Sequence, residues 1–182
     1  MTVVRTIEWL TSVLALVAAV GAVLLVVARL LASRVPVAGR LGAAVVALRT
    51  PLTFAVGAVA TLGSLYFSEV ADYVPCRLCW FQRIAMYPIA LVALVALIRR
   101  DRDARWYLVP MAAIGALISG YHYLIERGVL NDSAECLLFG PSCADVWFEE
   151  FGFVTLAFMA LAGFVAVIAL NTISFDRNQE AS

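Results

Sequence analysis

The sequence predicts an all-α integral membrane protein. Of its 182 residues, 64% are hydrophobic and only 14% are charged, which leaves too little polar surface to cover a soluble domain of this length. The apolar residues fall in long runs without a charge, and such runs are typical of membrane spans. Because an unpaired backbone is costly in lipid, we expect every run to be a helix.

Five such runs follow one another, and charged residues bound each of them. At about 1.5 Å per residue, the third run is short for a bilayer of roughly 30 Å, so its helix should begin earlier, near Cys79. The second helix has an alternative, earlier start in the apolar stretch Leu41–Leu48. In chain order the runs are Trp9–Ala28, Thr50–Ser68, Ile84–Ile98, Trp106–Ile125 and Phe151–Phe175.

Arginines orient these helices. The loops after the first and third helices, with the C-terminal tail, hold nine arginines and four acidic residues, whereas the other side holds four arginines and nine acidic residues. The positive-inside rule makes the first side cytoplasmic. The apolar core of the first helix is longer than the 7–15 residues of a signal peptide, so we expect this helix to be retained. A net charge of zero argues against nucleic-acid binding.

Four cysteines form two close pairs on the arginine-poor side. Cys76 and Cys79, the C-x-x-C pair, lie at the expected start of the third helix, where the partial positive charge of the helix favours a thiolate. Arg83 shares a helix face with Cys79 and can stabilise that thiolate or an anionic, planar acceptor. Cys136 and Cys143, the loop pair, lie between the fourth and fifth helices. Two exchangeable pairs predict a relay from a thiol partner to a lipid-soluble acceptor.

Other interpretations of these residues stay open. Two inert disulfides would staple the loops of a structural subunit, and four cysteines can form a zinc site. Arg83 can be an ordinary interfacial residue. His122, the single histidine, either lies at the interface or contacts the acceptor, and Trp147 fits an interfacial anchor. A small transporter is disfavoured, because no predicted span carries a charge at its centre.

A resemblance joins these motifs. Residues Cys76 to Arg83 read C-R-L-C-W-F-Q-R, and Tyr121-His122-Tyr123, the loop pair and the segment Phe151–Phe164 follow. Over roughly Pro51–Asn171 the sequence resembles the disulfide bond formation protein B family (DsbB-like), particularly its short-loop BdbC-like branch. Vitamin K epoxide reductase-like enzymes use similar chemistry, but in them the loop pair precedes the C-x-x-C pair.

The resemblance implies a four-helix transmembrane bundle, formed by the second to fifth helices, with one extra N-terminal transmembrane helix. We expect residues 1–35 to form the extra helix, 36–175 the redox domain and 176–182 a cytoplasmic tail. By resemblance, the protein is an enzyme of the cell membrane that reoxidises an extracytoplasmic thioredoxin-fold thiol oxidase (DsbA-like or BdbD-like). Its electrons pass to a membrane quinone, ubiquinone or menaquinone, and it contacts membrane lipid but neither metal nor nucleic acid.

The same resemblance implies a role for each cysteine. The thiolate of the partner would attack Cys136, Cys143 would exchange with Cys76, and Cys79 would face the quinone. The residues carried over as quinone-binding are Arg83, His122 and Trp147.

Overall fold

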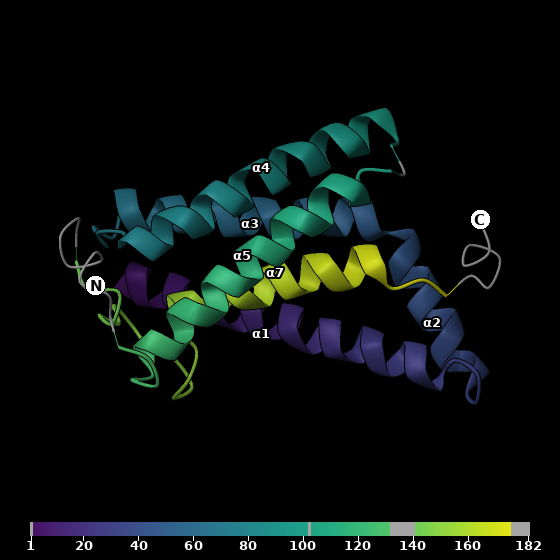
Figure 1. Ribbon diagram of the computed structural model, residues 1–182, viewed down its shortest axis with the longest axis horizontal. Helices are drawn as coiled ribbons and strands as arrows, with labels where there is room; N and C mark the ends of the chain where they lie inside the picture. The colour runs from purple at the N-terminus through teal and green to yellow at the C-terminus, as the bar shows by residue number, and fades with distance from the viewer. Residues whose placement is uncertain (1, 102, 132–140, 176–182) are drawn as a thin grey trace.

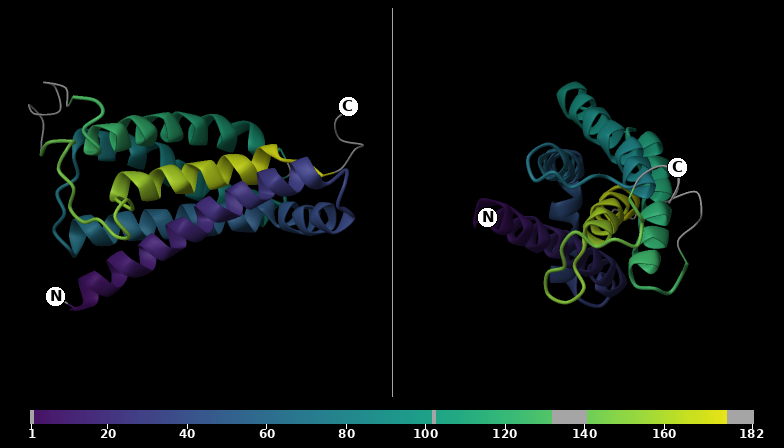
Figure 2. Two further views of the ribbon diagram at one scale, coloured as in Figure 1. Left: turned by 90° about the horizontal axis from the view of Figure 1, so that it is seen from below. Right: turned by 90° about the vertical axis from the view of Figure 1, so that its left-hand side faces the viewer.

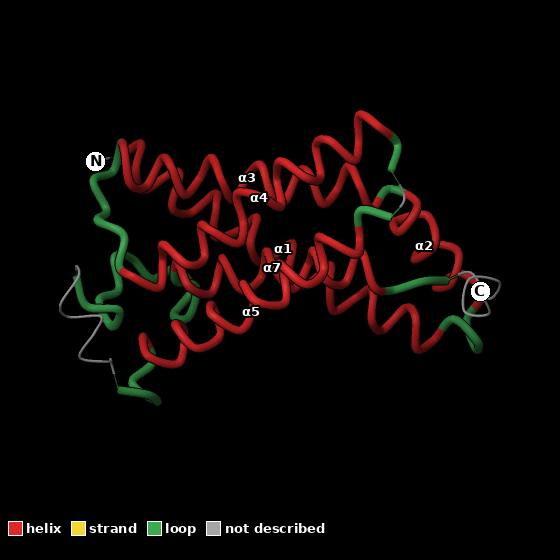
Figure 3. The backbone as a smooth tube through the Cα atoms, turned by 45° about the horizontal axis from the view of Figure 1, so that its top comes forward, coloured by secondary structure: helices red, strands yellow, loops and turns green. Residues whose placement is uncertain are grey.

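The computed structural model describes residues 2–101, 103–131 and 141–175. Within them the protein is helical, apart from one isolated β-bridge. The long helices run lengthwise through the molecule, and Figures 1 and 3 show the connecting loops gathered at its two ends. The helices are α1 (Thr2–Leu31), α2 (Pro36–Ala47), α3 (Arg49–Glu69), α4 (Arg77–Arg99), α5 (Arg105–Glu126) and α7 (Leu156–Thr172).

Four of the described helices, α1, α3, α4 and α5, are long and apolar enough to cross a membrane. Large apolar side chains cover their outer faces: Leu62 on α3 is 67% exposed and Leu117 on α5 is 76% exposed, whereas Ile89 in the core is fully buried. Apolar patches of this extent suit lipid rather than water. The predicted all-α membrane fold is therefore confirmed.

Helix α7 forms the centre of the bundle. It packs against α1, α3 and α5 and lies in the middle of the end-on view in Figure 2. Its 17 residues match the lower end of the roughly 17–25 residues that span a bilayer. Buried side chains such as Phe164 and Val167 occur around most of its circumference, as expected of a helix that is apolar all round.

Small residues let the neighbouring helices approach closely. A Cβ atom added at Gly57 on α3 would lie 3.0 Å from the Cα atom of Ala90 on α4. A Cβ atom added at Gly115 on α5 would lie 2.3 Å from the ring of Phe164 on α7. Glycine at both positions fits the small-residue packing of membrane helices.

The predicted fifth helix, Phe151–Phe175, was wrong at both ends. Phe151 and Gly152 have φ angles of 56° and 77°, which an α-helix does not accept. They form a turn closed by an antiparallel bridge between Glu150 and Val154. Apolar composition alone does not reveal this turn, because the turn is rich in aromatic residues and ends next to the first residue of α7.

The other helix starts agree better with prediction. The third predicted helix does begin before Arg83: α4 starts at Arg77. The apolar stretch Leu41–Leu48, an alternative start of the second helix, instead belongs mostly to the separate helix α2. Leu48 ends α2 and precedes α3, and its φ of −96° and ψ of 16° break the helical path.

The cysteine-bearing loops share one end of the bundle. Cys76 directly precedes α4, and Cys143 lies between α5 and α7. The segments before α4 and after α5 lie at the same end of the bundle as the N-terminal end of α1 (Figure 1). The turn between α4 and α5 lies at the opposite end with the last residues of α7. This alternation agrees with the predicted order of spans, whereas the side of the membrane on which each end lies stays a prediction.

Candidate functional site

The C-x-x-C pair caps the N-terminus of α4. Cys76 is the N-cap residue in an extended conformation, and its Sγ accepts a hydrogen bond of 3.3 Å from the backbone N–H of Cys79. The two sulfur atoms lie 2.8 Å apart. Two intervening residues in one helical turn therefore bring the sulfurs together, as the spacing predicts.

Cys76 faces the interior of the cysteine end. It is 4% exposed and packs in one buried cluster with Cys143, which is fully buried, and Ile125. Its Sγ lies 3.7 Å from Nε2 of His122. The inner cysteine of the C-x-x-C pair and the described cysteine of the loop pair thus share one buried environment.

His122 joins these groups. The side-chain amide of Gln82 donates a hydrogen bond of 3.0 Å to Nδ1 of His122, which leaves the ring proton on Nε2 when the imidazole is neutral. Nε2 lies 3.1 Å from the carbonyl oxygen of Cys143, to which it donates. The imidazole therefore connects Cys76 to the backbone of Cys143.

The surroundings of Cys76 favour its protonated form. The hydrogen bond with Cys79 and then burial raise the pKa of the Cys76 thiol, while the hydrogen bond with His122 acts in the opposite direction. In the reduced pair, Cys76 is therefore the thiol that keeps its proton.

A buried carboxyl group lies behind His122. The side chain of Glu126 is 3% exposed, and its Oε1 lies 3.8 Å from Nε2 of His122. Its Oε2 accepts a hydrogen bond of 2.5 Å from the hydroxyl of Thr155. The two polar side chains of α5 thus lie one turn apart, against the start of α7.

Arg83 lies on the other side of the pair and is fixed to α3. Its Nε donates to the hydroxyl of Ser64 at 2.9 Å, and its Nη2 donates to the Ser64 carbonyl at 3.1 Å. Its guanidinium lies 5.1 Å from the ring centre of Trp80, within cation–π distance. These contacts hold the Arg83 guanidinium at a defined position, so the side chain does not extend to the membrane surface.

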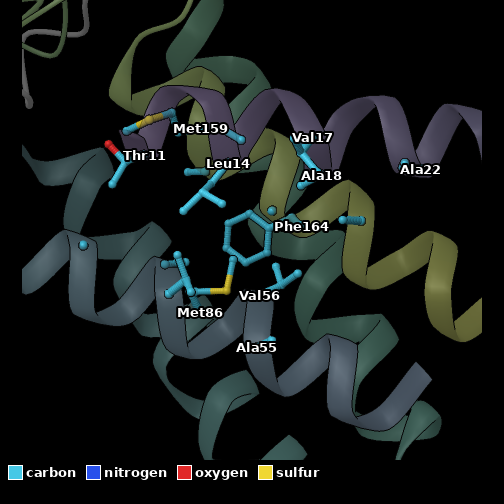
Figure 4. Close-up of a pocket in the computed structure, with 18 of the residues that line it drawn as sticks. Thr11, Leu14, Val17, Ala18, Ala22, Ala55, Val56, Met86, Met159 and Phe164 are labelled. Carbon is cyan, nitrogen blue, oxygen red and sulfur yellow. The ribbon is translucent and has the colours of Figure 1, made fainter. Parts of the chain in front are cut away.

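Cys79 and Arg83 line a cavity of about 930 Å³, here called the bundle cavity. Its walls come from α1, α2, α3, α4 and α7, and Figure 4 shows Leu14 of α1 and Val56 of α3 on either side of the Phe164 ring. Trp147 also lines the cavity and stacks on Tyr73 with ring centres 4.9 Å apart. An apolar cavity with a few convergent polar groups is typical of a small-molecule site.

A model of the family described as "Disulfide bond formation protein DsbB" matches residues 47–174. The chain belongs to this family. It is therefore a multi-pass membrane protein of disulfide bond formation, and a protein-disulfide oxidoreductase.

Relatives of the DsbB family support this assignment. The chain is 44% identical to "Probable disulfide formation protein C 1" of Bacillus anthracis over 109 residues, which are 60% of this chain and 78% of the relative. It is 40% identical to "Disulfide bond formation protein C" of Bacillus subtilis over 116 residues, 64% of this chain and 84% of the relative. No solved structure gives a significant match. The resemblance to the BdbC-like branch is thus confirmed.

The structure brings together most of the site residues predicted for this DsbB-family chain. Cys76, Cys79 and Cys143 gather at one end, and Arg83 and Trp147 line the bundle cavity. The remaining cysteine, Cys136, lies outside the described residues. His122 contacts Cys76 rather than the cavity, so the structure puts it on the exchange side of the C-x-x-C pair.

Three functional contacts escaped sequence reasoning. Ser64 fixes Arg83, Gln82 fixes His122, and Glu126 lies behind that histidine. Gln82 belongs to the C-x-x-C-W-x-Q-R string and was detectable by its position within it. Glu126 follows His122 by four residues on α5 and was detectable from that spacing, whereas Ser64 carries no local motif, since its partner lies on another helix.

Cys76, Cys79 and His122 also form a possible set of metal donors, because one atom from each lies within 4.8 Å of the others. A structural zinc site takes four ligands. The two sulfurs already contact each other, and Nε2 of His122 already donates to a carbonyl group. These contacts fit a dithiol that forms a disulfide better than a metal centre.

Proposed function

We propose that the protein reoxidises a thioredoxin-fold thiol oxidase and passes the electrons through its two cysteine pairs to a membrane quinone. The observation that carries this proposal is the position of the C-x-x-C pair between two different environments. Cys76 lies against Cys143 and His122, whereas Cys79 lines the bundle cavity beside Arg83. A relay needs this arrangement: one sulfur must exchange with a protein thiol and the other must reach the acceptor.

The first exchange takes place at the loop pair. A thiolate of the reduced partner attacks Cys136 of the Cys136–Cys143 disulfide, which forms a mixed disulfide and releases the Cys143 thiolate. The second thiol of the partner then attacks the mixed disulfide. The partner leaves oxidised, and the loop pair holds two electrons and two protons as thiols.

The second exchange transfers these electrons to α4. Cys143 attacks Cys76 of the C-x-x-C disulfide and releases Cys79 as a thiolate beside Arg83. Cys136 then attacks Cys143, which restores the loop disulfide and leaves Cys76 and Cys79 reduced. The buried cluster of Cys76, Ile125 and Cys143 supports this order, because it holds the two exchanging cysteines in one environment at the start of α4.

The bundle cavity fits a quinone. Its polar groups from Cys79, Gln82, Arg83 and Ser64 gather near the C-x-x-C pair, and most of the remaining lining is apolar. A bound quinone would supply a two-electron, two-proton acceptor. Arg83 would hold a ring oxygen by a charge-assisted hydrogen bond, and Trp147 would border the ring. His122 would act as a positioning residue: its imidazole would hold Cys76 in place and contact the sulfur that gains or loses the proton.

The arginine distribution supports the location. We propose that the protein lies in the cell membrane with both cysteine pairs on the extracytoplasmic face, where oxidation of thiols is favoured. Residues 36–175 would form the redox domain, 1–35 the extra helix and 176–182 a cytoplasmic tail. The partner would then approach from the extracytoplasmic side.

The order of the relay is tested with a Cys136→Ser variant. We expect it to lose oxidation of a thioredoxin-fold partner, yet still to reduce quinone when a small dithiol reduces the C-x-x-C pair directly. A Cys79→Ser variant is the matched control and should lose both activities. Stopped-flow absorbance of the quinone gives the rates. If Cys136→Ser passes no electrons from the small dithiol to quinone, the proposed order is wrong.

A further inference from the structure

The N-terminal helix takes part in the bundle cavity although it lies outside the family match. The family model covers residues 47–174, whereas α1 ends at Leu31. Nevertheless, α1 contributes a long row of lining residues, among them Leu14, Ala18 and Gly21, opposite Val59 of α3. Figure 4 shows this wall directly, with α1 facing α3 across the Phe164 ring. A helix outside the matched residues thus helps to enclose the cavity in this protein.

The cavity has one polar end and a long apolar remainder. Cys79 and Arg83 mark the polar end, and the lining continues along α1 from Thr11 to Leu31. At about 1.5 Å per residue this length of α1 is roughly 30 Å, which is close to the thickness of the hydrocarbon core. This shape suits an amphiphile with a compact polar head and a long apolar chain.

Specific polar contacts hold α1 against the cysteine end. Glu8 is 3% exposed within α1 and accepts a hydrogen bond from the hydroxyl of Tyr73, three residues before the C-x-x-C pair. Burial and this hydrogen bond raise the pKa of Tyr73 to about 12, so the phenol stays a donor at neutral pH. Arg5 pairs with Glu8 at 3.4 Å and with Glu150 at 2.9 Å. The helix is therefore fixed to both segments that flank the redox site.

We propose that α1 completes the acceptor site by binding the polyisoprenoid chain of the quinone. This inference rests on the proposed function and deepens it. The head would lie at Cys79 and Arg83, and the chain would extend between α1 and α3 toward α2. A phospholipid acyl chain is the alternative occupant of such a groove, and the experiment below distinguishes the two.

The test blocks the groove without touching the head site. Gly21 lines the cavity, and a Cβ atom added there meets nothing within 4 Å, so Gly21→Phe fills the groove without a backbone clash. Ala18→Phe, on the same wall, is the second variant. Gly120→Phe on α5 is the matched control, because its added Cβ atom also meets nothing within 4 Å and Gly120 does not line the cavity.

Two readouts are compared: the apparent KM for a tailless and for a long-chain quinone, and photolabelling by a quinone with a diazirine in its tail. For the long-chain quinone we expect both groove variants to raise the apparent KM about tenfold, or about 1.4 kcal/mol. The tailless quinone should change less than twofold, and the Gly120→Phe control should match the wild type for both. The diazirine should label α1 in the wild type, and Gly21→Phe should abolish that labelling.

The outcomes separate the two proposals. A wild-type protein that reduces no quinone of either kind overturns the proposed function and this inference with it. If the wild type reduces quinones but the groove variants affect both kinds equally, or neither, the inference alone is overturned. Labelling confined to α3 and α4 has the same meaning. The inference is also overturned if native mass spectrometry detects a co-purifying phospholipid that excess long-chain quinone does not displace.

Discussion

Replacing Arg83 with Ala removes the one arginine that lines the bundle cavity among the described residues. Its two hydrogen bonds to Ser64 use Nε and Nη2, and neither uses Nη1. A hydrogen bond from this charged group to a quinone oxygen is worth roughly 1.5–3 kcal/mol. Because every 1.4 kcal/mol is tenfold, the apparent affinity for quinone should fall about 10- to 150-fold. Arg83→Lys keeps the charge but loses the planar fork, so its effect should be intermediate.

Ser64 provides a sharper version of this prediction. Ser64→Ala removes the hydroxyl that accepts from Nε but keeps the carbonyl that accepts from Nη2. A single side-chain hydrogen bond contributes about 0.5–1.5 kcal/mol, and the expected loss of affinity is therefore roughly 2- to 13-fold. If Ser64 acts only by positioning Arg83, Ser64→Ala should add nothing in the Arg83→Ala background, since the two residues belong to one network.

Steady-state reduction of quinone by a small dithiol measures these affinities in detergent. Thiol exchange between the partner and the loop pair is followed in parallel and should change little in either variant. An Arg83→Ala protein with unaltered apparent quinone affinity would assign this residue to ordinary interfacial anchoring. Additive effects of Ser64→Ala and Arg83→Ala would refute the positioning role of Ser64 even if both variants are impaired.

Two further predictions concern the exchange side and the topology. His122→Ala removes the hydrogen bond that lowers the pKa of Cys76, so less Cys76 thiolate is present at pH 7; reoxidation of the C-x-x-C pair should slow several-fold and recover as the pH rises, at about tenfold in thiolate per pKa unit. An unchanged profile of rate against pH would contradict this role. Asp103→Cys, in the arginine-rich α4–α5 turn and in a background with the four native cysteines replaced by Ser, should resist an impermeant maleimide in intact cells and react after lysis. Labelling in intact cells would reverse the orientation.

The sequence predicted those features that depend on local composition and spacing. Uncharged runs located the spans, because lipid demands both apolar side chains and closed backbone hydrogen bonds. The C-x-x-C spacing predicted the meeting of Cys76 and Cys79, and the four-residue step placed Arg83 on the face of Cys79. The turn at Phe151 and Gly152 was missed, since aromatic residues and glycine in a turn do not lower apolarity enough to mark a boundary.

Contacts between distant helices were beyond the reach of these patterns. Nothing local links Ser64 on α3 with Arg83 on α4, or Glu8 on α1 with Tyr73 before α4. His122 is the clearest example: its position near the end of α5 fitted either an interface or the acceptor, and only packing brought it beside Cys76. Such side chains find partners through the arrangement of the helices, which periodicity along one helix does not encode.

The two faces of the C-x-x-C pair explain why a single helix turn suffices for the proposed relay. Cys76 is enclosed with a histidine that bonds the Cys143 carbonyl, so the sulfur that exchanges with a protein sulfur is the one in the buried cluster. Cys79 lines an apolar cavity beside a fixed arginine, so the sulfur released by that exchange is the one that faces the proposed lipid-soluble acceptor. If the pair were turned by half a helical turn, both arrangements would be lost, because Cys79 would face the buried cluster and Cys76 the cavity. Ser64 and Gln82, which hold the arginine and the histidine by hydrogen bonds, are therefore positioning residues of the proposed relay.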